Sequence, residues 1–174
     1  YGHGLEQVAK ILAEKFPKGG LIRRNFSRGG WFGVDSIVEA LRLRREGIVN
    51  PILVLGFTLS SRMEDAAREN ISISISNFDA LDAVSNMAIR PAIHLKLDTG
   101  MHRQGFLDRD TRRLVAIMKK KRVVPEGIFT HFASAKDACY PTYTLMQLSH
   151  FQKAVAWIEG AGFSNMIRHA AATG

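Results

Sequence analysis

Short strand-like segments alternate with amphipathic helical segments along the whole sequence, and this alternation limits the possible folds more than any other feature. Residues 51–56, PILVLG, form a short apolar run typical of a strand buried in a parallel sheet. In residues 4–16 the apolar side chains recur at the spacing of one helix face: Leu5, Val8, Ile11, Leu12 and Phe16. Strands are predicted over 31–34, 51–56, 71–76, 91–100, 126–133 and 164–171, and helices over 4–16, 36–47, 60–70, 78–88, 108–122 and 142–162. The order predicts an α/β fold with a parallel sheet covered by helices.

The ends of the expected helices carry capping signals. Asp35 or Ser36 can cap the second expected helix, which Gly47 ends, and Ser60 or Ser61 can cap the third. The fifth has acidic residues at its start and basic residues at its end, which complements the helix dipole.

Two architectures fit the alternation, a doubly wound open sheet and a (β/α)8 barrel. The segment ISISIS at 71–76 favours the barrel, because its isoleucines would face the helices and its serines a packed interior near a polar mouth. We therefore expect a partial TIM-type (β/α)8 barrel with parallel strands and outer helices, lacking the first strand and the final elements. The chain starts at Tyr1 without a methionine and stops directly after an apolar run, so we interpret it as a fragment.

Composition excludes some classes of protein. The formal charge of +8 could suit nucleic acid, but the basic clusters at 42–45 and 119–122 lie at expected helix ends, where cations complement the dipole. Interleaved aromatics and zinc-ligand spacing are absent, so we predict neither nucleic-acid binding nor a metal site. No apolar run is long enough to cross a membrane and no signal peptide is visible. The single cysteine, Cys139, cannot form an internal disulfide, which predicts a reducing compartment.

Reactive side chains follow three of the expected strands. In a parallel α/β protein the ligand lies beyond the carboxyl ends of the strands, so these groups predict a site. Each one alone also has a structural interpretation: a lysine near an aspartate is often a plain ion pair, and a strand-end histidine often only supports its neighbours. The groups are Lys96, Asp98 and Arg103; Thr130 and His131; and Arg168, His169, Thr173 and Gly174.

Residues 94–106, HLKLDTGMHRQGF, closely resemble the signature of alanine racemases, a family of pyridoxal-phosphate enzymes with a (β/α)8 barrel domain. YGHG at 1–4 resembles the end of that family's cofactor segment, Lys-Ala-x-Ala-Tyr-Gly-His-Gly. THFASAKD at 130–137 and RHAAATG at 168–174 resemble later segments. The resemblance covers essentially the whole chain. It implies that residues 1–174 are an incomplete pyridoxal-phosphate-binding barrel domain without the family's C-terminal β domain.

The resemblance also implies roles for residues that would bind pyridoxal 5'-phosphate. Tyr1 matches the tyrosine whose hydroxyl binds the cofactor phosphate, and Thr173 and Gly174 match a hydroxyl residue and a small residue at the same phosphate. His131 matches the histidine packed against the cofactor ring. His169 matches a histidine linked to the arginine that meets the pyridine nitrogen. Ala172 departs from the asparagine that is frequent in the family.

Lys96 and Arg103 match a coupled pair in the family. The lysine is carbamylated in many members, to N6-carboxylysine, and the carbamate orients the arginine, which reaches the cofactor's phenolic oxygen and the substrate carboxylate. A carbamate would turn Lys96 into an anion able to hold a guanidinium in bidentate geometry. The alternative, an unmodified Lys96 paired with Asp98, stays open.

The resemblance also implies what this chain does not contain. The Schiff-base lysine precedes Tyr1, the tyrosine base belongs to the C-terminal domain of a partner subunit, and the arginine at the pyridine nitrogen follows Gly174. We therefore expect no catalytic residue in this chain and no activity from it in isolation. The parent protein is expected to be a bacterial, cytoplasmic, homodimeric alanine racemase that interconverts L- and D-alanine for peptidoglycan synthesis.

Three alternatives remain. The protein could be a racemase for serine or another amino acid, or a non-catalytic pyridoxal-phosphate-binding barrel. A basic nucleic-acid-binding domain would explain the charge alone, and salt-dependent DNA binding would support it.

Overall fold

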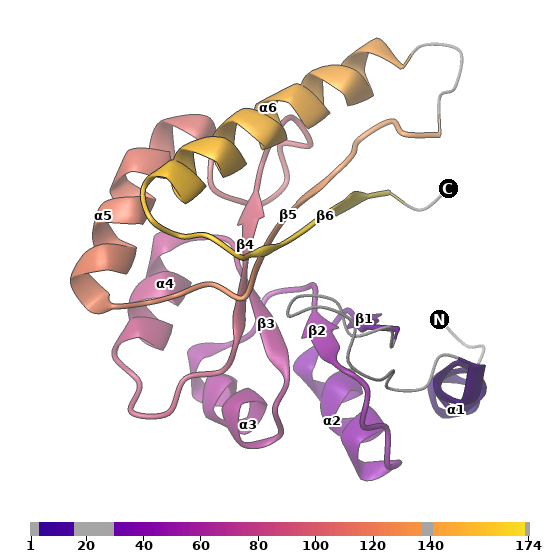
Figure 1. Ribbon diagram of the computed structural model, residues 1–174. Helices are drawn as coiled ribbons and strands as arrows, with labels where there is room; N and C mark the ends of the chain where they lie inside the picture. Colours follow the sequence, from indigo (N-terminus) through magenta and orange to yellow (C-terminus); the bar gives the residue numbers. More distant parts are fainter. Residues whose placement is uncertain (1–3, 16–29, 137–140, 173–174) are drawn as a thin grey trace. The chain divides into compact units, whose positions relative to one another are not determined.

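The computed structural model describes residues 4–15, 30–136 and 141–172, and its helices and strands lie where the sequence predicts them (Figure 1). Each predicted strand is present, although every one is shorter than its sequence pattern. The elements are α1 (Leu5–Lys15), β1 (Phe32–Val34), α2 (Ile37–Arg45), β2 (Ile52–Val54), η1 (Ser60–Arg62), α3 (Met63–Arg68), β3 (Ser72–Ile75), α4 (Phe78–Ser85), β4 (Ile93–Leu97), η2 (Asp108–Asp110), α5 (Thr111–Lys121), β5 (Gly127–His131), α6 (Thr142–Gly160) and β6 (Ile167–Ala171).

The chain forms two compact units. The first comprises Tyr1–Ser74 with Met87–Ala92, and the second comprises Ile75–Asn86 with Ile93–Gly174. Candidate site residues in the described part of the chain all belong to the second unit.

In the first unit, β1, β2 and β3 pair in parallel, with Phe32 opposite Ile52 and Leu53 opposite Ser72. All three residues of β2 are buried, as expected for an apolar strand inside a parallel sheet. Ser74 is also buried, and its hydroxyl donates to the Val54 carbonyl at 2.6 Å. The buried hydroxyl of Ser74 is therefore satisfied by a hydrogen bond within the sheet.

The N-cap of α2 is Ser36, one of the two residues that the sequence predicts for it. The Ser36 hydroxyl accepts from the Glu39 amide at 3.3 Å, and the Glu39 carboxylate accepts from the Ser36 amide, which makes a capping box. The predicted cap at Ser60 or Ser61 is wrong. Both serines lie inside the 3-10 turn η1, which runs directly into α3, so the residue before α3 is Arg62, without a side-chain cap.

In the second unit, β4, β5 and β6 pair in parallel and in close register. Lys96 lies opposite Phe129, which lies opposite His169. Because side chains alternate along a strand, these three residues form one row across the same face. Two positions earlier, His94, Gly127 and Ile167 form a second row. Helices α5 and α6 pack against each other, and α6 packs on β5 (Figure 1).

Candidate functional site

The loop after β4 folds back onto its own strand. The Asp98 amide donates to the Phe106 carbonyl and the Phe106 amide donates to the Lys96 carbonyl, each at 2.9 Å. Phe106 is buried and contacts Phe78 edge to face, with ring centroids 5.1 Å apart. This closed loop, residues 98–106, carries the exposed Arg103.

Asp98 shapes the loop from inside. Its Oδ1 accepts from the amides of Gly100 and His102, both at 3.0 Å. Gly105 closes the loop with φ +132°, and a Cβ there would lie 2.6 Å from the Asp98 amide nitrogen. Within the described chain, Asp98 makes no ion pair with Lys96. The structure therefore gives Asp98 a role in loop geometry, and its charge also raises the pKa of Lys96.

Replacing Asp98 tests this role. Asp98→Ala is expected to lower the free energy of unfolding by about 1 kcal/mol, because two backbone donors lose a charged acceptor and must turn to water. Asp98→Asn keeps an oxygen in the same place and should lose less than half as much. Urea unfolding of both variants of the complete protein measures the difference. Equal losses in the two variants would contradict a role that depends on the Oδ1 acceptor.

Lys96 is a buried amine in the middle of the row on β4, β5 and β6. It is 5% exposed, and its Nζ lies 5.7 Å from the centroid of the Phe129 ring. Burial lowers the pKa of Lys96, the charge of Arg103 lowers it further, and Asp98 partly offsets the shift. More of this amine is therefore neutral than for a lysine in water, and the neutral amine is the form that reacts with carbon dioxide.

His131 ends β5 beside the same charges. Its pKa is lowered by burial, then by Arg103 and then by Lys96. The two strand ends are held together by hydroxyls, because the Thr130 hydroxyl donates to the Leu97 carbonyl at 3.0 Å and lies 2.8 Å from that of Thr99. The structure thus brings Lys96, Arg103 and His131 within electrostatic reach of one another. Among them, the charged guanidinium of Arg103 suits an anionic ligand.

His169 lies on β6, on the far side of Phe129 from Lys96. Its ring stacks on Phe129 with a centroid distance of 4.8 Å and an interplanar angle of 6°. Burial, followed by the neighbouring His94, lowers the pKa of His169 to about 4. His169 is therefore neutral at pH 7.

Not every predicted strand-end group belongs to this arrangement. Arg168 donates through Nε and Nη2 to the carboxylate of Glu159 at 2.9 Å and 2.5 Å, so it holds β6 to α6. Tyr1, Thr173 and Gly174 lie outside the described residues. No group of three or more metal-ligating side chains gathers in the described ranges. Likewise, no described helix is long and apolar enough to cross a membrane.

Sequence reasoning missed His94, Phe129 and Glu126. His94 Nδ1 lies 2.9 Å from His169 Nε2, and His94 Nε2 lies 3.2 Å from a carboxylate oxygen of Glu126. The alternation of side chains along a strand could have indicated His94, because it places His94 on the same face as Lys96.

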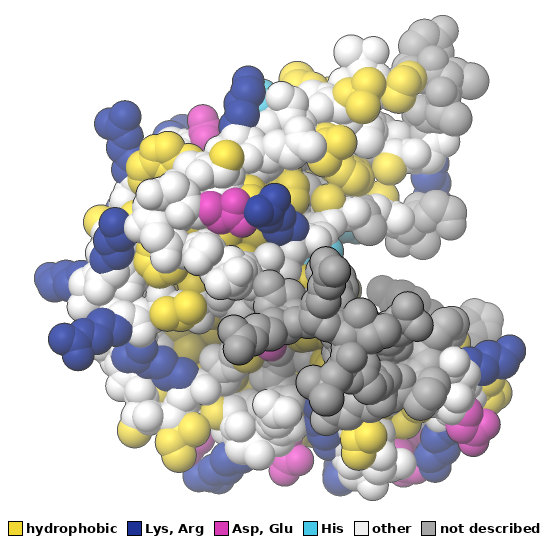
Figure 2. All heavy atoms as spheres, in the orientation of Figure 1, with side chains coloured by type: hydrophobic (Ala, Val, Ile, Leu, Met, Phe, Trp, Pro, Cys, Tyr) yellow, Lys and Arg dark blue, Asp and Glu magenta, His cyan; other side chains and the backbone are white. Residues whose placement is uncertain are grey.

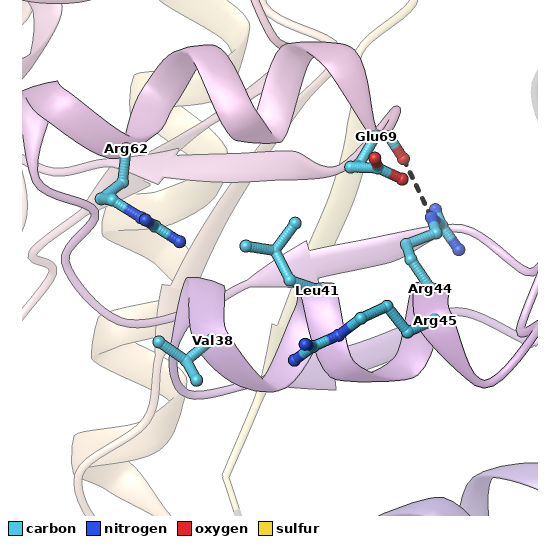
Figure 3. Close-up of a pocket in the computed structure, with 6 residues that line it drawn as sticks. All are labelled: Val38, Leu41, Arg44, Arg45, Arg62 and Glu69. Atoms are coloured by element: carbon cyan, nitrogen blue, oxygen red, sulfur yellow. Dashed lines mark hydrogen bonds between the residues drawn. The ribbon is translucent and has the colours of Figure 1, made fainter.

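A pocket lined by three arginines lies on the first unit, between α2 and the α3 region (Figure 3). Arg44 there donates to four backbone carbonyls, those of Ile48, Asn50, Glu69 and Asn70. Arg62 pairs with Asp65 at 3.1 Å. These two arginines hold the backbone and a neighbouring carboxylate, so the pocket has a structural explanation. It is lined by Val38, Leu41, Arg44, Arg45, Arg62 and Glu69.

Comparison with known proteins gives consistent matches over the whole chain. The family described as "Alanine racemase, N-terminal domain" matches residues 1–174. An alanine racemase of Clostridium tetani is 37% identical over 177 residues, covering 98% of this chain and 42% of that protein. The structure of an alanine racemase from Clostridium difficile 630 is similar, with a TM-score of 0.83 and 28% identity over 98% of this chain and 45% of that one.

A histidine racemase from Leuconostoc mesenteroides subsp. sake is also similar in structure, with a TM-score of 0.73 and 26% identity over 97% of this chain and 43% of that one. The chain thus spans less than half the length of these relatives. Together with the parallel strands and the intervening helices, the likeness confirms the predicted fold class, a partial (β/α)8 barrel.

Proposed function

The chain belongs to the alanine racemase N-terminal domain family, and we propose that the complete protein is a pyridoxal 5'-phosphate-dependent racemase that interconverts L- and D-alanine. The observation that carries this proposal is the convergence of Lys96, Arg103 and His131 at the strand ends. The positive charge of Arg103 suits a substrate carboxylate and a phosphorylated cofactor.

The residues of the site fit the cofactor. A neutral His169 held flat against Phe129 offers a polar edge without adding charge, and His131 offers a ring that could pack against the cofactor. Tyr1, Thr173 and Gly174 would hold the phosphate, by the family resemblance. The cofactor, when bound, supplies a ring that stabilises the negative charge left on the substrate Cα after proton loss.

Arg103 would bind the substrate carboxylate through two parallel N–H donors, which fix the orientation of the substrate. Lys96, as a carbamate, would hold the guanidinium from the other side. The lowered pKa of Lys96 supports this modification, since it enlarges the fraction of neutral amine at pH 7. The groups that move the proton, a lysine before Tyr1 and a tyrosine of the partner subunit, lie outside this chain in our proposal.

Purified complete protein tests the proposal. With pyridoxal 5'-phosphate, we expect an absorbance band of the lysine-bound cofactor and conversion of L-alanine to D-alanine, measured with D-amino acid oxidase. A chain limited to residues 1–174 should give no D-alanine. Carbon-13-labelled carbon dioxide should give one carbamate signal that Lys96→Ala abolishes. If the complete protein binds the cofactor but racemises no amino acid, the proposal is wrong and the protein is a non-catalytic pyridoxal-phosphate-binding barrel.

Amino-acid specificity requires its own measurement, because a histidine racemase has a similar fold. We propose alanine since two curated relatives, 33% and 37% identical to this chain, are named alanine racemases. Racemisation of alanine, serine and histidine compared at equal concentrations should show the highest kcat/KM for alanine. A higher value for either of the others would replace alanine as the substrate.

The cellular setting follows from the same proposal. We propose a homodimeric, cytoplasmic protein that supplies D-alanine for peptidoglycan, since the matching relatives come from bacteria. The nucleic-acid alternative gains no support from the face shown in Figure 2. On the face shown in Figure 2, Lys and Arg side chains stand at several separate places instead of forming one patch.

A further inference from the structure

We propose that Glu126 and His94 are positioning residues that fix the tautomer of His169, so that His169 keeps a proton on Nε2 and a bare acceptor at Nδ1. The inference rests on the proposed function only for the identity of the group that His169 meets. The chain of contacts itself belongs to the described structure.

Three side chains form a continuous line from the start of β5 to the middle of β6. Glu126 precedes β5, and its carboxylate is 37% exposed. His94 lies between the other two and is 1% exposed. Its Nε2 lies 3.2 Å from Glu126 Oε2, and its Nδ1 lies 2.9 Å from His169 Nε2. The line therefore joins a partly solvated carboxylate to a histidine of the candidate site.

The positions of the protons follow from what each group can donate. An ionised carboxylate only accepts, so the proton of His94 must lie on Nε2, facing Glu126. His94 Nδ1 is then an acceptor, and His169 must donate to it from Nε2. Because His169 is neutral at pH 7, its Nδ1 is left without a proton.

The backbone is built around the His94 ring. A Cβ on Gly127 would lie 2.5 Å from His94 Cε1 and 2.9 Å from Cγ, and closer still to Nδ1. Gly127 has none of the positive φ values that require glycine, so space for the imidazole is the reason for glycine here. His169 is held equally firmly by its stacking on Phe129. Both rings are therefore fixed in orientation, as they must be if their contacts are to hold His169 in a single tautomer.

A bare Nδ1 on a fixed, neutral ring has a definite chemical use. It accepts a hydrogen bond from a donor without neutralising that donor's charge. In the proposed enzyme it would orient the arginine that the family resemblance places at the pyridine nitrogen. If the tautomer were reversed, two donors would face each other and the arginine would be pushed out of position.

Nitrogen-15 NMR of the complete protein, labelled in histidine and freed of cofactor, shows directly which ring nitrogen of His169 carries the proton. His169 is assigned by comparison with His169→Gln. We expect its Nε2 to carry the proton and its Nδ1 to resonate as a bare nitrogen. Glu126→Gln keeps a carbonyl acceptor and should preserve this pattern. Glu126→Leu removes the acceptor, so the form protonated at Nδ1 should rise from a minor species to a comparable share.

Two results would overturn the inference. One is a wild-type His169 that carries its proton on Nδ1, or a doubly protonated His94. The other is a Glu126→Leu spectrum identical to wild type. If Glu126→Leu does not fold, the wild-type and Glu126→Gln spectra still decide. The NMR measurement needs no cofactor. A protein that fails to racemise alanine would therefore refute the proposed function without affecting the inference that Glu126 and His94 fix the tautomer of His169.

Discussion

Arg103→Lys in the complete protein is expected to lower kcat/KM for alanine racemisation by roughly 100-fold, and Arg103→Ala by more. A bidentate guanidinium–carboxylate pair contains two charge-assisted hydrogen bonds, each worth about 1.5–3 kcal/mol, and a lysine ammonium cannot reproduce the paired geometry. The loss should appear in both kcat and KM, since Arg103 would bind the substrate and also orient it. Initial rates of L- to D-alanine conversion measure it.

Arg109→Lys is the matched control, because Arg109 is an exposed arginine in η2, just after the loop that carries Arg103. It should keep wild-type rates. Cofactor absorbance of each variant shows whether the site is still loaded. An Arg103→Lys protein within threefold of wild type, with a loaded site, would remove Arg103 from the proposed substrate contact.

Much of the fold could be predicted because short buried strands and amphipathic helices leave separate periodicities in the sequence. The capping box at Ser36 was predictable for the same local reason, since the serine and Glu39 stand three residues apart. The failure at Ser60 and Ser61 has a different cause. A 3-10 turn placed before α3 moves the helix start by a few residues, and nothing in local sequence distinguishes the two outcomes.

The candidate site was only partly predictable, because its residues meet across strands. Lys96 and His131 could be found, since each lies near the end of an apolar strand. The partner of His94 could not be found, because 75 residues separate His94 from His169. Strand register alone brings them together. Arg168 shows the opposite error: it is next to His169 in sequence, but it pairs with Glu159 on α6.

Gly127→Ala is expected to lower the free energy of unfolding by about 2–4 kcal/mol, the largest stability effect we predict. The added methyl group would overlap the His94 ring, so the ring must move and give up its bonds to Glu126 and His169. Gly160→Ala is the control, because a Cβ on that helical glycine meets nothing within 4 Å. It should change stability by less than about 1 kcal/mol. Urea unfolding of the complete protein measures both.

A double-mutant cycle separates steric overlap with His94 from any other effect of the new methyl group. His94→Ala removes the ring, so adding Gly127→Ala to it should cost about 1 kcal/mol or less, far below its cost in the wild-type background. That coupling identifies the imidazole as the group for which the glycine makes room. If Gly127→Ala costs as much without the ring as with it, the strain lies in the β5 backbone. The glycine would then say nothing about how His94 is held.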